Sequence, residues 1–202
     1  MKEWIRKCVL VATLAPVVSC IGVEDYGTAW DRAALEKGLA GSWKEIASRP
    51  DQSRAQGYGI GVVSTFVEKG GAYQVTTFDP EGKTTRPGAV VPTERPIYPI
   101  KTISIGPYRF VATPAPHGFL ERYVLRGNVL EVCMAIGPAQ VDFQKKEYPN
   151  AVNVGKNRSE GSFLEIRRWD DEVENVIAAI PDTHEYWDCD WKYVRVSSPT
   201  GR

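Results

Sequence analysis

Val129-Leu130-Glu131-Val132-Cys133-Met134-Ala135-Ile136 is the stretch of the chain that decides the fold. Its larger apolar side chains recur at every second position, and this period is typical of a strand that buries one face. Leu130, Val132, Met134 and Ile136 are therefore expected to face a core, whereas Cys133 is expected to point the other way.

Strand patterns continue outward from this stretch in both directions. Strands are expected over 42–46, 58–67, 72–78, 100–105, 108–113, 119–125, 162–169 and 191–196, with turns such as Glu68-Lys69-Gly70-Gly71 between them. Four prolines between 86 and 99 exclude a regular central strand, so a long loop is expected there. An antiparallel meander of about eight strands protects its edges best by closing into a barrel.

Helices are expected near both ends of this mainly β chain. Good helix formers run from Ala29 to Ala40, with Thr28 as a cap and Gly41 as a stop. Asp170-Asp171 precedes Val173, Val176, Ile177 and Ile180, which predicts a helix before the last strand. The stretch 137–161 is polar and rich in turn formers, and we expect a loop.

The N-terminus has the layout of a secretion signal. Lys2, Arg6 and Lys7 precede an apolar stretch of about ten residues, which is too short to span a membrane. Val17-Val18-Ser19-Cys20 resembles the lipobox of bacterial lipoproteins, which implies removal of 1–19 and acylation of Cys20. Residues 20–27 would then be a lipidated tether and 28–202 the folded domain. An ordinary signal cut near Ala15 or Ser19, or an N-terminal core helix, is the alternative.

The lipoprotein resemblance implies a cell-envelope location. Ile21 rather than Asp follows the cysteine, which favours the periplasmic side of the outer membrane if the host has two membranes. Without 1–19 the chain has 22 basic and 24 acidic residues and no basic run, which argues against a nucleic-acid partner. Cys133 and Cys189 remain, and they can form a disulfide or stay as two buried thiols.

Two short motifs resemble lipocalin-like proteins. Gly41-Ser42-Trp43 opens the first expected strand and resembles the Gly-x-Trp start of lipocalin-like barrels. That resemblance implies that Trp43 plugs one end of a barrel and stacks on a late arginine, Arg195 or Arg167. A glycine helix stop before a buried tryptophan is the alternative interpretation. The stretch from Gly127 to Arg167 is similar to the second half of an uncharacterised bacterial lipocalin-like family.

No catalytic or cofactor pattern stands out. The densest cluster of potential metal ligands surrounds His184, from Asp182 to Asp190, but it has no second histidine and favours a solvated acidic turn. His117 is expected in a loop. Gly57-Tyr58-Gly59-Ile60-Gly61 lacks the helix that a nucleotide-binding loop requires. We therefore expect no enzyme activity, no cofactor and no metal.

These observations favour a lipid-anchored, non-enzymatic protein. A lipocalin-like barrel implies a cup that is filled by its own side chains or holds one small ligand. The leading hypothesis is binding of a small apolar ligand or an envelope component. The alternatives are a structural or protein-docking lipoprotein with a solid barrel, and, last, an envelope hydrolase or metalloprotein that uses the His184 cluster.

Overall fold

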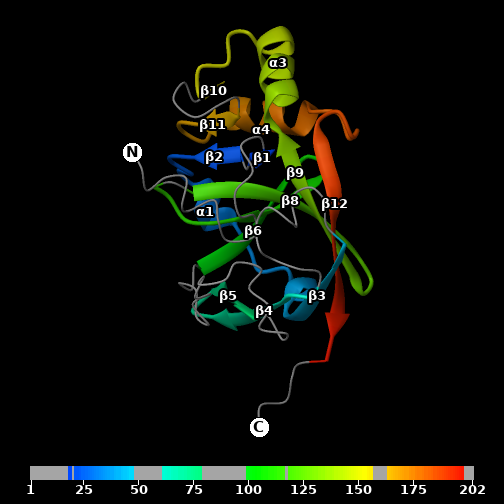
Figure 1. The fold of residues 1–202 in the computed structure, drawn as a ribbon. Coiled ribbons are helices and arrows are strands. Elements are labelled where there is room, and N and C mark those ends of the chain that lie inside the picture. The colour runs from blue at the N-terminus through cyan, green and yellow to red at the C-terminus, as the bar shows by residue number, and fades with distance from the viewer. Residues whose placement is uncertain are drawn as a thin grey trace, which may run out of the picture.

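A computed structural model describes residues 18–19, 21–47, 61–78, 99–116, 118–156 and 163–197, and the fold is mainly β (Figure 1). Cys20, His117 and residues 57–60 lie outside the described residues, as does the expected loop except for Pro99. The strands are β1 (Val18–Ser19), β2 (Ile21–Val23), β3 (Gly41–Ala47), β4 (Val63–Lys69), β5 (Ala72–Phe78), β6 (Pro99–Ile105), β7 (Tyr108–Ala112), β8 (Gly118–Arg126), β9 (Val129–Ile136), β10 (Val154–Lys156), β11 (Leu164–Ile166) and β12 (Trp187–Val196). The helices are α1 (Ala29–Arg32), α3 (Gly137–Glu147) and α4 (Asp171–Ala179), with a 3-10 turn η1 (Lys37–Leu39).

Eight of the strands pair in a closed ring. Their order is β9-β12-β3-β4-β5-β6-β7-β8, and β8 pairs again with β9. Every neighbouring pair in the ring is antiparallel, and β3 to β9 follow one another as a meander. The prediction of a mainly β meander is confirmed. The last strand, β12, closes the ring between β9 and β3 after the chain has formed α3, β10, β11 and α4.

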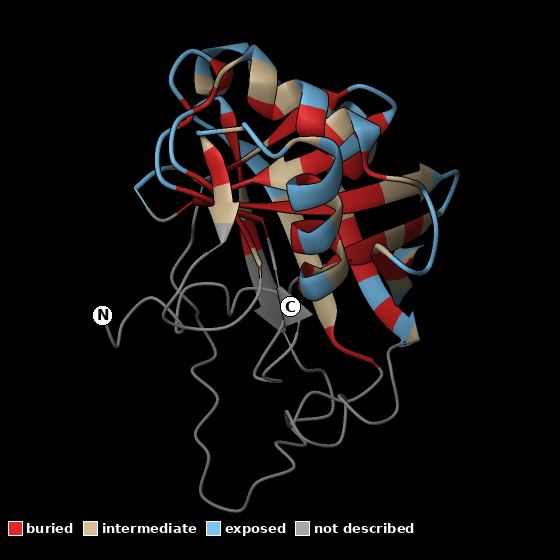
Figure 2. Ribbon diagram, turned by 90° about the horizontal axis from the view of Figure 1, so that it is seen from above, coloured by how far each residue is buried: buried red, intermediate tan, exposed pale blue. Residues whose placement is uncertain are grey.

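Two hydrophobic cores lie on opposite faces of the ring strands. The inner core is inside the ring and includes Trp43, Leu130, Val132 and Met134. The outer core lies between the outer face of the ring and β2, β10, β11, α3 and α4, which gather at one end of the molecule (Figure 1). Figure 2 shows exposed positions on the outward sides of the helices and buried positions along the strands. The inward direction predicted for Leu130, Val132 and Met134 of β9 is therefore confirmed, whereas Ile136 is half-buried and belongs to neither core. Cys133 points the other way, as predicted, but faces a second core and is fully buried.

The helix expected over 29–40 is wrong in extent. Only Ala29–Arg32 is α-helical, and Thr28 makes no side-chain cap. Ala34 instead exchanges backbone hydrogen bonds with Thr102 of β6, at 3.0 and 2.8 Å, and the Thr102 hydroxyl also donates to the Ala34 carbonyl oxygen. These tertiary bonds replace the helical ones, and η1 forms separately.

The stretch expected as a polar loop holds α3 and β10. The buried face of α3 includes Gln140 and Gln144 beside Val141, so no apolar period marks it. Gln140 donates from Nε2 to the Tyr186 carbonyl oxygen at 2.9 Å, and Gln144 to that of Tyr148 at 2.9 Å. By contrast, α4 is confirmed: the Asp170 side chain accepts from the Val173 backbone N–H at 3.0 Å, as its cap.

The segment expected as a tether, 20–27, includes a strand of the sheet. Ile21–Val23 pairs antiparallel with β8 and parallel with β11, and Ile21 and Val23 are buried. The expected strand 162–169 shortens to Leu164–Ile166 and lies outside the ring, beside β2. Both β2 and β11 are held in place by packing in the outer core. The hydrophobic pattern of a short stretch of sequence does not reveal such tertiary packing.

Candidate functional site: the interior of the ring

The interior of the ring contains a cavity of about 40 Å³. Since a water needs roughly 10–15 Å³ of such space, the cavity has room for about three water-sized groups. Its lining is mainly apolar, with Phe66, Val75, Ile100, Phe119 and Val132 among the residues that form it. Side chains of β3 to β9 and β12 alternate inward and outward, so the ring brings together residues that are far apart in the sequence.

Trp43 and Leu39, which lies in the turn before β3, line the cavity inside the ring. Trp43 is fully buried, and its Nε1 donates to the Leu39 carbonyl oxygen at 2.9 Å. The Arg195 guanidinium lies 4.3 Å from the centre of the Trp43 ring and donates to the carbonyl oxygens of Gly38 and Ala40. Gly41 has a φ of +112°, and a Cβ there would lie 2.9 Å from Arg195 Nη1. The structure therefore brings Gly41, Trp43 and Arg195 together.

The other arginine considered from the sequence lies elsewhere. Arg167 follows β11, and its Nη2 would be 3.4 Å from a Cβ built on Gly155 of β10. It belongs to the outer part of the molecule and not to the surroundings of Trp43.

A polar cluster around Glu36 joins the segment before β3 to strands β5, β7 and β8. Tyr123 of β8 donates its hydroxyl to Glu36 Oε2, and Arg109 Nη1 donates to Glu36 Oε1 at 2.7 Å. Tyr73 of β5 donates to the Glu36 carbonyl oxygen at 2.7 Å. Burial and the hydrogen bond to Glu36 raise the pKa of Tyr123 far above its usual range, so this phenol stays neutral.

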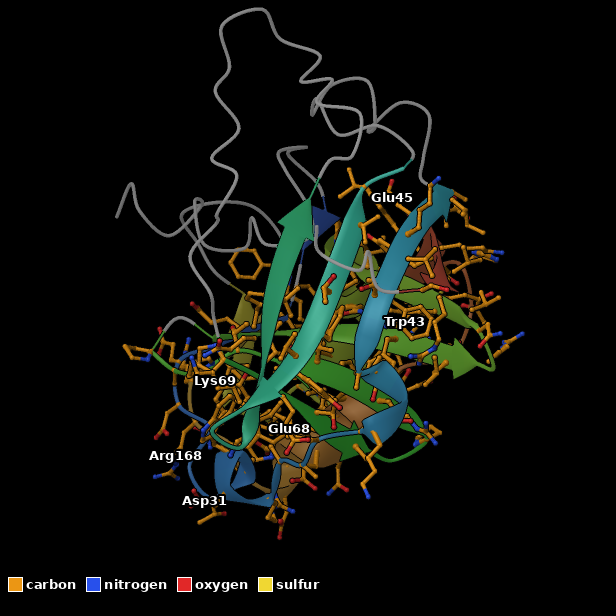
Figure 3. The ribbon with its side chains drawn as sticks, turned by 90° about the horizontal axis from the view of Figure 1, so that it is seen from below. Asp31, Trp43, Glu45, Glu68, Lys69 and Arg168 are labelled. Atoms are coloured by element: carbon orange, nitrogen blue, oxygen red, sulfur yellow. A yellow bond between two sulfur atoms is a disulfide. The ribbon has the colours of Figure 1, made fainter. Side chains whose placement is uncertain are left out.

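Two carboxyl groups are buried inside the ring. Glu45 and Glu121 are each 4% exposed. Figure 3 shows Glu45 beyond Trp43 along β3, and Glu45 pairs in register with Tyr193 of β12. Glu121 of β8 lines the cavity. Burial, followed by the charges of Glu45 and Glu121, raises the pKa of Tyr193, so both carboxyl groups act on one phenol.

Glu121 has an unusual environment for a carboxyl group. Within the part of the chain that the structure describes, it forms no hydrogen bond or ion pair. Burial raises the pKa of Glu121 from 4.5 to about 7, because the apolar surroundings disfavour its charged form. Near neutral pH the group is therefore partly protonated and can donate or accept a hydrogen bond, or pair with a cation.

The His184 region does not converge on a site. Asp182 pairs with Arg122, with 2.7 Å between Oδ1 and Nη2, and His184 is exposed. Cys189 forms a disulfide with Cys133, with Cα atoms 4.0 Å apart, on the outer face of β9 and β12. Among the described residues, no group of three His, Cys, Asp or Glu side chains is placed to hold a metal ion. Residues 182–190 therefore serve several separate contacts.

The buried carboxyl groups were not among the residues predicted from the sequence. Glu121 lies two residues from both Phe119 and Tyr123 in β8, so its side chain is on the same face of the strand as theirs. Alternation alone therefore places Glu121 inside the ring. Glu45 is likewise two residues from Trp43 in β3 and is on the same face of that strand. An ionisable residue at an inward position was the available signal.

Comparison with known proteins found no match among protein-family models, curated proteins or solved structures. Within the described ranges, every helix is too short or too polar to cross a membrane.

Proposed function

We propose that this protein is a lipid-anchored envelope lipoprotein with a lipocalin-like barrel that binds a small, mainly apolar ligand. The observation that carries the proposal is the cavity inside the ring, which is lined by apolar side chains and bordered by a few polar ones. This combination is typical of ligand sites, in which apolar surface provides affinity and a few polar groups fix orientation. The volume of about 40 Å³ limits the enclosed part of the ligand to a few heavy atoms.

The proposed anchor rests on the sequence around Cys20. Acyl chains contribute about 0.8 kcal/mol per buried methylene, so more than one chain gives durable attachment. Ile21 is 1% exposed and starts β2. An acylated Cys20 would therefore adjoin the folded sheet directly, and the domain would be held close to the bilayer.

The anchor is tested with two cysteine variants and labelled palmitate. Cys20→Ser is expected to abolish labelling and release the protein from the membrane fraction. Cys8→Ser, which changes a cysteine inside the proposed signal, is the matched control and should leave both unchanged. Continued labelling of the Cys20→Ser protein would contradict the anchor.

Ligand binding is tested on the mature protein in phosphatidylcholine nanodiscs. We expect a panel of ligands with four to six heavy atoms, including 1-butanol and n-butylammonium, to shift the NMR methyl signals of Val75, Ile100 and Val132. Val132→Leu fills part of the cavity and should weaken binding, whereas Val67→Leu, on an exposed position of β4, should not. If no member of the panel shifts these signals, the ligand proposal fails.

A second candidate function is protein docking by a nearly solid ring, and the small cavity volume favours it. Cross-linking in intact cells separates the two candidates. A stable envelope partner that survives Val132→Leu, together with a failed ligand panel, would support docking.

A further inference from the structure

Glu121 is buried inside the ring and lines its cavity, whereas the one buried cation in the described part of the chain, Arg122, belongs to the outer face. Arg122 lies between the rings of Tyr108 and Trp187 and pairs with Asp182. The inner core therefore holds one carboxyl group, that of Glu121, with no hydrogen-bond or ion-pair partner among the described residues.

Arg109 and Arg195, the arginines near Glu36 and Trp43, already have partners. Arg109 of β7 lies opposite Tyr123 of β8, which is two residues after Glu121. Arg109 pairs with Glu36. Arg195 is held over Trp43. Among the described residues that line the cavity with Glu121, the other titratable ones are Tyr123 and Tyr193, and both are phenols.

A buried carboxylate without a partner is costly, and a cation restores its charged form. Phe66, Phe119 and Tyr193 line the same cavity as Glu121, and aromatic rings attract a positive charge. An ammonium group is compact enough for a site with room for about three water-sized groups, and a short alkyl chain matches the remaining apolar wall.

We propose that the ligand is a small organic cation, a protonated alkylamine, whose ammonium group pairs with Glu121 and whose alkyl part packs against the apolar lining of the ring. This inference rests on the proposed ligand-binding function and names the ligand class. The ammonium group binds the ionised form of Glu121. Protonation of Glu121 at lower pH therefore releases the ligand.

The test compares n-butylammonium with 1-butanol, which has the same length and no charge, on the mature protein in phosphatidylcholine nanodiscs. We expect n-butylammonium to bind at least tenfold more tightly at pH 8. Glu121→Gln should weaken n-butylammonium by about 10- to 100-fold, the effect of a lost charge-assisted hydrogen bond, and change 1-butanol by less than about threefold. Glu68→Gln, on an exposed residue at the far end of β4 (Figure 3), is the matched control.

The pH profile gives an independent readout that does not need a variant. An alkylammonium keeps its proton between pH 6 and 8, as lysine does. The pKa of about 7 for Glu121 predicts that n-butylammonium affinity falls about tenfold from pH 8 to pH 6, whereas 1-butanol affinity does not fall. A flat profile for n-butylammonium would overturn the inference.

The outcomes separate the two proposals. Equal binding of n-butylammonium and 1-butanol would overturn the cation inference and leave the ligand-binding function standing. Binding of neither would overturn both. Phosphatidylethanolamine nanodiscs distinguish a free amine from a lipid headgroup: competition with n-butylammonium there identifies the headgroup as the source of the ammonium, and unchanged binding identifies a free amine.

Discussion

The inner and outer cores share the same strands but differ in how they treat polar groups. In the outer core, Arg122 is stacked between aromatic rings and paired with Asp182, and a disulfide joins β9 to β12. In the inner core, Glu121 has no partner among the described residues and borders a cavity. The outer core is packed for stability, whereas the inner core carries a feature that opposes stability and suits binding.

The outer core should contribute most of the stability. Ile177 of α4 is fully buried there, and Gly106 in the turn between β6 and β7 lets the helix approach, because a Cβ would lie 2.6 Å from the Ala178 Cβ. Ile177→Ala is expected to lower the free energy of unfolding by about 4 kcal/mol. The same change at Ile100, which lines the inner cavity, should cost only about 2 kcal/mol because fewer atoms surround that side chain.

Urea unfolding followed by circular dichroism measures both changes. Equal losses for Ile177→Ala and Ile100→Ala would contradict the distinction between the two cores.

The disulfide is the second test of the outer core. It closes a sequence separation of 56 residues, and the loop-entropy relation gives about 4 kcal/mol for a loop of this size. Replacing Cys133 and Cys189 together by Ala should therefore lower the unfolding free energy by about 3–4 kcal/mol. Reductant should destabilise the native protein by a similar amount and leave the double variant unchanged. An unfolding free energy of the native protein that is unchanged by reductant would argue against the disulfide.

Glu121 should make the inner core a source of instability at neutral pH. Its pKa is about 7 in the folded protein and 4.5 in the absence of burial, so the folded state holds its proton longer than the unfolded state. Stability therefore falls as pH rises through this window. Since each pKa unit corresponds to 1.36 kcal/mol, Glu121→Gln should be more stable than the native protein by about 3 kcal/mol at pH 8.

At pH 4.5 and below, that difference should vanish. Unfolding free energies of both proteins, measured from pH 4 to 8, give the difference directly, with Glu68→Gln as the control. A constant difference across the range would contradict the raised pKa of Glu121.

The sequence predicted the elements whose signals are local. The Asp170 cap, the Glu68-Lys69-Gly70-Gly71 turn and the alternation in 129–136 correspond to α4, the β4–β5 hairpin and β9. It did not predict α3, whose buried face is partly glutamine, or the interruption at Ala34, whose partners are on β6. Those features depend on tertiary hydrogen bonds that no local pattern records.

The candidate site could likewise be predicted from the sequence only in part. The resemblance to lipocalin-like proteins implied contact of Trp43 with Arg195 or Arg167, and the structure places Arg195 there. Glu121 follows Phe119 by two positions in β8, so strand alternation predicts that its side chain also points into the ring. The cavity itself follows from the packing of eight strands around one axis, which a reading of single strands does not give.

The smallest expected effect is a change in stability whose sign should differ between the two cores. Val132 lines the inner cavity, and Val176 of α4 is fully buried in the outer core. Val132→Leu adds a methylene to empty space and should stabilise the protein by up to about 0.8 kcal/mol. Val176→Leu adds the same group to a filled core and should destabilise it by about 1–3 kcal/mol. Thermal unfolding of the two variants measures this pair, and a loss of stability in both would mean that the ring interior is packed as tightly as the outer core.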